Sequence, residues 1–164
     1  MPRYFTQYWN QETCAESERY AGHPLDYTAS NLFRKCGVRK GDIVYPVTVR
    51  RGRLFLIGRL IVGQICGRLE AENILDDDEL WEGADEYLIA SSATPMHFHI
   101  EVPTEVTEKL LFVASPHSKH LLFIEPGRLD KQTLRSVREI EPASARALDE
   151  LLSPDRPTIP ARKS

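Results

Sequence analysis

The chain alternates between short apolar runs and polar turns, a pattern typical of a protein built mainly from strands. Residues 3–9 alternate in polarity and predict a first strand, and residues 87–91 predict a later one. The β-branched and aromatic runs 43–49 and 54–65 are separated by turn residues, which predicts a hairpin between them. Three further apolar runs predict additional strands, at residues 96–102, 109–114 and 120–126.

Helical spacing is confined to a few short segments. One apolar stripe recurs at i, i+3, i+4 and i+7, and its members are Ala29, Leu32, Phe33 and Cys36. This stripe predicts a short helix over residues 28–36, begun by a polar cap and ended by Gly37. Residues 131–137 and 143–152 predict two later helices, and the acidic run 76–79 is interpreted as the start of another.

Many short strands interrupted by brief helices indicate an α+β fold. We expect a small β-barrel of about five or six strands, with the helix over residues 28–36 packed across one opening. A length of 164 residues with 41% hydrophobic content fits one domain over residues 1–152. Residues 153–164 contain three prolines and no apolar period, so they predict a flexible C-terminal tail. The residues expected to be buried are Leu32, Phe33, Val47, Val49, Leu56, Ile57 and Ile89.

Charge is segregated along the chain, although the net charge is only −3. Residues 34–68 contain nine Lys or Arg and one acid, whereas residues 69–108 contain twelve acids and no Lys or Arg. One interpretation is that the two blocks lie side by side and neutralise each other. The other is that the basic block binds phosphates, since a positive surface attracts a polyanion even on a slightly acidic chain. The residues assigned to phosphate binding are Arg34, Lys35, Arg50, Arg51 and Arg53.

The sequence contains few signals for a membrane, metal or redox role. No apolar run approaches the ~20 residues that span a bilayer, and the N-terminus lacks the apolar core of a signal peptide. We therefore expect a cytoplasmic protein with no membrane partner. The three cysteines lie far apart without a CxxC pair and are expected to be reduced and buried. His97, His99 and Glu101 have a spacing that suits a metal, but we interpret them as the exposed face of a strand.

Catalytic motifs are weak as well. Residues 37–41 lack the Lys-Ser/Thr ending of a phosphate loop, and the serines near His117 lack a nucleophile elbow. The acidic run 76–79 lacks the alternating spacing of a calcium loop. We therefore expect no catalytic residue, no metal and no cofactor.

Four segments follow one another in a recognisable order, namely the aromatic first strand YFTQYW, the segment TASNLFRK followed by VRKGDIVY, the strand LIGRLIVGQI, and the late RLDKQTLRSVREI. In these segments and their order the chain resembles the EVE domain of the PUA-like superfamily. The match as a whole spans roughly residues 3–152. The chain departs from the usual Lys-Ser-Glu-Pro stretch after the first strand, where it has Gln7, Tyr8, Trp9 and Asn10.

The resemblance implies that a modified nucleobase of DNA or RNA binds in a pocket between the barrel and the helix over residues 28–36. Aromatic rings can stack on the faces of a base, while a helix N-terminus and short polar side chains hydrogen-bond its edge. The residues expected to bind this ligand are Tyr8, Trp9, Tyr27, Thr28, Ser30, Asn31 and Trp81. In the alternative interpretation, Ser30 and Asn31 only cap the helix and the aromatic residues only pack in the core.

Three classes of function remain open from the sequence. The first is a non-catalytic module that reads a modified base in DNA or RNA. The second is a PUA-like module of the ASCH type that binds RNA or acts as an enzyme, which requires a Lys or an acidic residue inside the pocket. The third is a domain that binds a protein or a small ligand. A pocket lined by Trp9 and Asn31 with a basic rim favours the first class.

Overall fold

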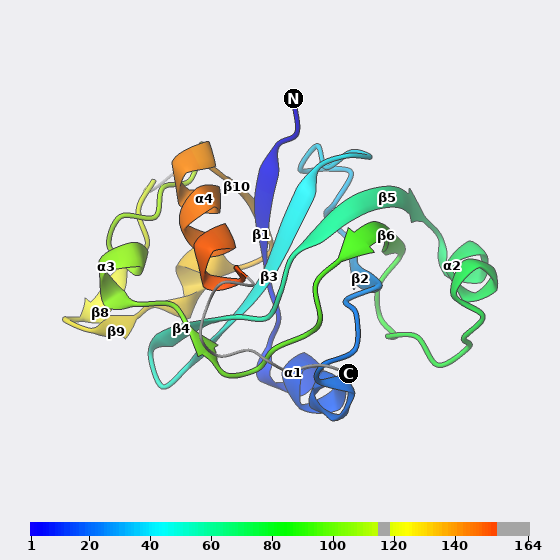
Figure 1. Ribbon diagram of the computed structural model, residues 1–164, viewed down its shortest axis with the longest axis horizontal. Coiled ribbons are helices and arrows are strands. Elements are labelled where there is room, and N and C mark those ends of the chain that lie inside the picture. Colours follow the sequence, from blue (N-terminus) through cyan, green and yellow to red (C-terminus); the bar gives the residue numbers. More distant parts are fainter. Residues whose placement is uncertain (115–118, 154–164) are drawn as a thin grey trace.

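The structure, a computed structural model, describes residues 1–114 and 119–153 (Figure 1). Within these residues the chain has the expected α+β fold, with ten strands and four short α-helices. The strands are β1 (Tyr4–Tyr8), β2 (Tyr27–Ser30), β3 (Ile43–Arg50), β4 (Arg53–Leu56), β5 (Leu60–Cys66), β6 (Glu86–Ala93), β7 (Ile100–Glu101), β8 (Phe123–Glu125), β9 (Arg128–Leu129) and β10 (Val137–Ile140). The helices are α1 (Gln11–Ser17), α2 (Arg68–Leu75), α3 (Thr104–Thr107) and α4 (Pro142–Leu151), with 3-10 helices η1 (Glu18–Tyr20) and η2 (Lys131–Leu134).

Eight of the strands form one sheet, whose main path runs β10-β1-β3-β5-β6-β2. β1 and β3 are parallel, and the other paired strands are antiparallel. β3 pairs with β5 at residues 43–44 and with β4 at residues 47–50, so it changes partner at Pro46. A proline has no N–H to donate, and it is tolerated where the ladder is interrupted.

The sheet curls so that β2 lies against β1. In the strand order, β2 is the last strand and β1 is the second, so the two are far apart along the sheet. Even so, the Gln7 side chain of β1 donates from Nε2 to the Ala29 carbonyl of β2 at 2.9 Å. Trp9 and Thr28 form a second link between the same two segments. Within the described residues no backbone pairing joins the two ends of the path, so the closed barrel expected from the sequence is not confirmed.

Both faces of β3 are buried, which places this strand at the centre of the molecule. Tyr45 and Val47 face a core shared with Leu148 of α4, whereas Val44 faces a second core around Phe5. In Figure 1, α4 lies in front of the sheet on the left and α2 lies at its right edge. Six of the seven residues expected to be buried are buried, namely Phe33, Val47, Val49, Leu56, Ile57 and Ile89, and Leu32 is half-buried.

The predicted helix over residues 28–36 is wrong. Tyr27–Ser30 is the strand β2, paired with β6, and only a turn follows before Gly37. The apolar stripe is misleading because Ala29 is buried as a strand residue, while Phe33 is buried from the turn. Pairing with β6 outweighs the local helical spacing, since a strand gains hydrogen bonds and cross-strand contacts that depend on a distant partner.

Several strands are shorter than the apolar runs that predict them. The run 54–65 is divided near Gly58, where a Cβ atom would lie 2.8 Å from the Thr94 hydroxyl. Residues 96–102 contain only β7, residues 109–114 contain only isolated bridges, and residues 120–126 contain β8. Apolar side chains of these segments enter the core around α4 from turns, so their burial does not require a ladder.

The later helices agree with the sequence in part. The prediction for residues 143–152 is confirmed by α4. Residues 131–137 instead form η2 and the start of β10, because the backbone leaves the helical conformation at Arg135, whose ψ is 140°, and Ser136 follows with a left-handed φ of 74°. The acidic run 76–79 follows α2 rather than starting a helix. The predicted tail lies outside the described residues from residue 154 onward.

Candidate functional site

Four segments that are distant in the sequence enclose a cleft of about 820 Å³. They are the end of β1 with the start of α1, the end of β2 with Asn31, the loop after α2, and η2 with the residues that follow it. The cleft is lined by Gln7, Tyr8, Trp9, Asn10, Gln11, Glu12, Thr13, Ala29, Ser30, Asn31, Trp81, Glu82, Gly83, Ala84, Lys131, Gln132, Arg135 and Ser136. Five of the seven residues expected to bind a base therefore meet here, namely Tyr8, Trp9, Ser30, Asn31 and Trp81.

Trp9 forms the floor of this cleft and is only 2% exposed. Its indole Nε1 donates to the Thr28 hydroxyl at 3.3 Å, and that hydroxyl donates to Gln7 Oε1 at 2.7 Å. Thr28 is fully buried and does not line the cleft, so its role is to hold the floor. A buried polar network in which each donor has a partner fixes side-chain positions.

Thr28→Val is expected to lower the free energy of unfolding by about 1–2 kcal/mol. Valine keeps the shape of the side chain but leaves Trp9 Nε1 and Gln7 Oε1 without their buried partner. Urea denaturation followed by tryptophan fluorescence measures the loss, and Ser92→Ala at an exposed position of β6 is the control. Wild-type stability in Thr28→Val would show that the network does not hold the floor.

Trp81 forms one wall of the cleft and is half-buried. Its ring centroid lies 4.8 Å from that of Trp9, and the two ring planes make an angle of 78°. The Tyr27 ring lies 5.5 Å from the Trp81 ring, and the Tyr27 hydroxyl accepts the Trp81 backbone N–H at 3.1 Å. Burial raises the pKa of Tyr27 to about 12, so this hydroxyl stays neutral. Tyr27 therefore supports Trp81 without lining the cleft.

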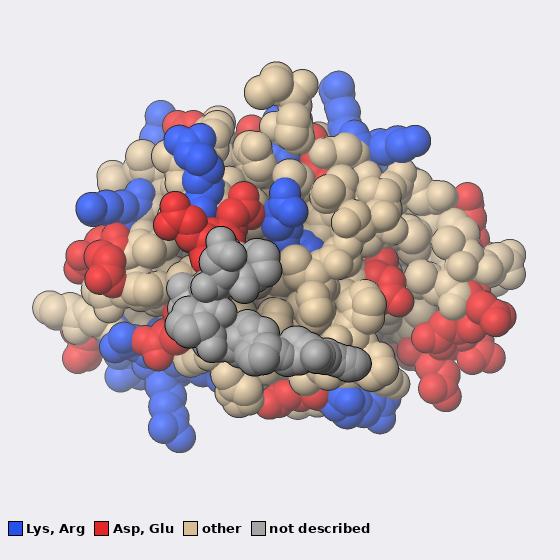
Figure 2. Space-filling model, viewed as in Figure 1, with Lys and Arg blue, Asp and Glu red and all other residues tan. Residues whose placement is uncertain are grey.

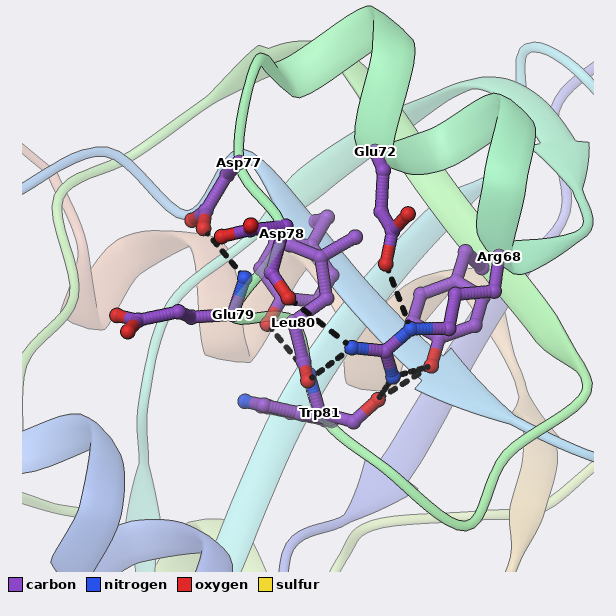
Figure 3. A network of polar contacts seen from close by, with 9 residues as sticks. Arg68, Glu72, Asp77, Asp78, Glu79, Leu80 and Trp81 are labelled. Carbon is purple, nitrogen blue, oxygen red and sulfur yellow. Dashed lines mark hydrogen bonds and ion pairs between the residues drawn. The ribbon is translucent and has the colours of Figure 1, made fainter.

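Arg68 braces the loop that carries Trp81 (Figure 3). Its guanidinium donates to the Trp81 carbonyl at 2.8 Å, to the Leu80 carbonyl at 3.2 Å and to the Asp78 carbonyl at 3.3 Å. A 2.8 Å bond from Nε to Glu72 raises the pKa of Arg68, so the guanidinium stays charged. From the sequence, Arg68 is assigned only to the basic block. The one local pattern that indicates a structural role for it is its i, i+4 spacing to Glu72.

Ser30 and Asn31 place hydrogen-bond donors beside these rings. The Asn31 side-chain oxygen accepts the Asp85 backbone N–H at 2.6 Å, so the amide nitrogen is the end left to donate to a ligand. Ser30 Oγ accepts the Leu32 N–H at 3.1 Å, which leaves its hydroxyl proton to donate. The expected helix N-terminus is absent here because β2 takes its place, and these two side chains supply the polar edge instead.

The charged side chains of the cleft come in two groups. Glu12 and Glu82 come from α1 and the loop after α2, and Lys131 and Arg135 come from η2 and the residue after it. All four are exposed. The sequence does not assign Lys131 and Arg135 to the site, because only the pairing of β10 with β1 brings them to it.

None of the five residues predicted to bind phosphate lines this cleft. Arg53 forms a 2.5 Å ion pair with Glu101, and Arg50 lies over the Phe55 ring at 4.2 Å. Arg34 donates to the Ile65 carbonyl at 2.9 Å, while Lys35 and Arg51 are exposed. The ion pair of Arg53 joins the basic and acidic blocks, which favours local neutralisation at that point.

Ser136 lines the cleft in a strained conformation. Its φ of 74° is one of three left-handed values at non-glycine residues in the described part of the chain. The Ser136 carbonyl accepts the Tyr8 N–H at 3.2 Å, which ties this turn to β1. Backbone strain of this kind is concentrated at functional sites, and the preceding residue, Arg135, also lines the cleft.

Within the described residues, no three His, Cys, Asp or Glu side chains lie close enough together to hold a metal ion. Burial lowers the pKa of His97, whereas His99 is exposed and Glu101 pairs with Arg53. The three cysteines are free thiols, and burial raises the pKa of each. No helix of the described chain has the length and apolar character needed to cross a membrane.

Comparison of the chain with protein-family models, curated proteins and solved structures found no significant match. Function is therefore inferred from the cleft itself. The fold and site define an α+β protein with an aromatic corner, a pair of hydrogen-bond donors and a charged rim in one open cleft.

Proposed function

We propose that this protein is a non-catalytic module that binds one unpaired, modified base of DNA or RNA in the cleft. The observation that carries the proposal is that Asn31 lines the same cleft as the nearly perpendicular rings of Trp9 and Trp81. A flat ligand with a polar edge fits such a corner, because one ring can stack on its face while the amide reads its edge. The proposal agrees with the resemblance to EVE domains, and membership of the chain in that PUA-like family is part of it.

Trp81 is the ring with surface to offer a base. Trp9 is almost fully covered by its neighbours, whereas Trp81 is half-buried and lies on an open wall. Stacking of a base on an aromatic ring contributes about 1–3 kcal/mol and depends little on which base is stacked. Trp9 then supports Trp81 and closes the floor beneath the ligand.

Asn31 and Ser30 provide the means to discriminate between bases. Both are left with a donor, so they suit a base edge that presents carbonyl or ring-nitrogen acceptors. The loss of one partner of a polar pair costs more than the pair contributes, which is how such contacts give specificity.

The charged residues of the cleft favour binding over catalysis. The ASCH-type alternative needs a Lys or an acid in the pocket, and Lys131, Glu12 and Glu82 are present. All three are exposed, however, and catalytic acids and bases are usually tuned by burial. A binding role therefore fits their surroundings better.

A binding screen tests the proposal. Fluorescence anisotropy is measured with labelled single strands of about ten nucleotides, as DNA and as RNA, each with one central base that is unmodified or carries an added alkyl or hydroxyalkyl group. We expect one modified base to bind at least about tenfold more tightly than its parent, a difference of about 1.4 kcal/mol. The absence of binding by every strand, or equal binding by all, would overturn the proposal.

Asn31→Asp is expected to weaken binding of the preferred base by about 1–3 kcal/mol while the fold is retained. The new carboxylate still accepts the Asp85 N–H, so the loop contact survives, but the donor to the base is lost. Anisotropy and circular dichroism measure the two properties. Asn73→Asp adds the same charge at an exposed position of α2 outside the cleft and is the control. An unchanged preference in Asn31→Asp would remove Asn31 from base reading.

A further inference from the structure

The two walls of the cleft differ sharply in charge. Residues 76–86, which include the wall with Trp81 and Glu82, contain seven acids and no Lys or Arg. Figure 2 shows acidic side chains gathered at the right of the molecule, over α2 and the loop after it. The wall built from η2 and the residues after it contributes Lys131 and Arg135. A phosphate group in the cleft is therefore repelled from one wall and attracted to the other.

Lys131 and Arg135 have no acid paired with them among the described residues. Neither forms an ion pair within the part of the chain that the structure describes, and Arg135 donates to the neutral Gln132 side chain at 3.1 Å. By contrast, Arg53 and Arg68 are both ion-paired. An exposed cation without a paired acid keeps its full attraction for a polyanion.

The segment that carries these cations is well braced. The Asp130 carboxylate accepts the Gln132 N–H at 3.0 Å, and the Thr133 hydroxyl donates to the Asp130 carbonyl at 2.9 Å. Arg138, which lies in β10, donates to the Thr133 carbonyl at 2.5 Å. Because the backbone of η2 is held from both ends, the two cations are presented at a defined place on the cleft rim.

We propose that Lys131 and Arg135 form a subsite for the phosphodiester groups next to the bound base. The acidic loop around Glu82 keeps the backbone away from the Trp81 side, so the nucleotide enters with its sugar and phosphates on the η2 side. This inference rests on the proposed base-binding function. It assigns backbone binding to residues other than the five basic residues predicted from the sequence.

The salt dependence of binding tests the subsite. Affinity for one mixed-sequence single-stranded DNA of about ten nucleotides is measured by anisotropy over a series of salt concentrations. Each phosphate contact contributes roughly 0.7 to the slope of log affinity against log salt. Lys131→Ala/Arg135→Ala should flatten that slope by about 1.4, with the far-ultraviolet circular dichroism unchanged. Arg39→Ala/Lys40→Ala removes the same charge from exposed positions outside the cleft and should leave the slope nearly unchanged.

A change in the DNA distinguishes direct contact between the two cations and the flanking phosphates from a general electrostatic attraction to the strand. The two phosphates that flank the central nucleotide are replaced by neutral methylphosphonates, which should reduce the affinity of the wild-type protein. The Lys131→Ala/Arg135→Ala variant should lose no further affinity for this strand, because the contacts are already absent.

The outcomes distinguish the subsite from the proposed function. An unchanged slope in the double variant, with normal binding by the wild type, would overturn the subsite alone. A flattened slope in Arg50→Ala/Arg53→Ala but not in Lys131→Ala/Arg135→Ala would place the phosphates on the β3–β4 turn and would also overturn it. If the wild-type protein binds no strand, the proposed function and the subsite both fail.

Discussion

Trp9→Ala should lower the free energy of unfolding by about 3–5 kcal/mol, the cost typical of removing a buried aromatic side chain. Trp9 is 2% exposed and belongs to the core that includes Phe5, Phe33 and Val44. The truncation leaves a cavity beneath the cleft and also removes the donor to Thr28. Urea or thermal denaturation followed by far-ultraviolet circular dichroism measures the loss.

Trp9→Phe serves as the matched control for this prediction. Phenylalanine refills most of the cavity but cannot donate to Thr28, so a smaller loss of about 1–3 kcal/mol is expected. Wild-type stability in Trp9→Ala, combined with loss of base binding, would contradict the burial and return Trp9 to the role of an exposed stacking ring.

Trp81→Ala should weaken oligonucleotide binding by about 1–3 kcal/mol for modified and unmodified bases alike, because stacking is insensitive to the identity of the base. The side chain is half-buried and lies on a loop, so the protein should remain folded. Anisotropy with the strands used in the screen measures the loss, and circular dichroism confirms the fold. Undiminished binding would show that the base does not stack on this wall.

Two further variants separate the Trp81 ring from the position of its loop. Leu69→Ala removes an apolar side chain that is 78% exposed on α2, so it should change neither binding nor fold. Arg68→Lys keeps the positive charge but cannot span the carbonyls of Asp78, Leu80 and Trp81 together. If a preformed wall is needed, Arg68→Lys should weaken binding although Trp81 is intact.

The cleft also gives a physical meaning to the charge pattern of the chain. The acidic block extends along α2 and into the wall that carries Trp81, where it disfavours phosphate. The basic block does not reach the cleft; Arg68 from this block folds back to brace the acidic loop, and Arg53 pairs with Glu101. Lys131 and Arg135, which form no ion pair within the described residues, come instead from η2 and the residue after it.

Local sequence patterns correctly predict those elements whose apolar residues recur at short range. The strand over residues 3–9, the strand over residues 43–49 and the helix over residues 143–152 are present near their expected bounds. Alternating polarity, a continuous β-branched and aromatic run, and helical spacing predict them in turn. The sequence also brought together Trp9, Asn31 and Trp81 as candidates for one site, and all three line the cleft.

Features that depend on a distant partner are not predictable from local spacing. Tyr27–Ser30 is a strand because β6 lies beside it, although its apolar spacing suits a helix. Trp9 is buried because the fold packs it in one core with Phe5 and Val44, and Lys131 reaches the cleft because β10 pairs with β1. Arg68 braces the Trp81 loop through backbone carbonyls, which carry no signature of residue type. Local spacing records which side of an element is apolar, whereas strand pairing and bonds to carbonyls depend on which segments the fold brings into contact.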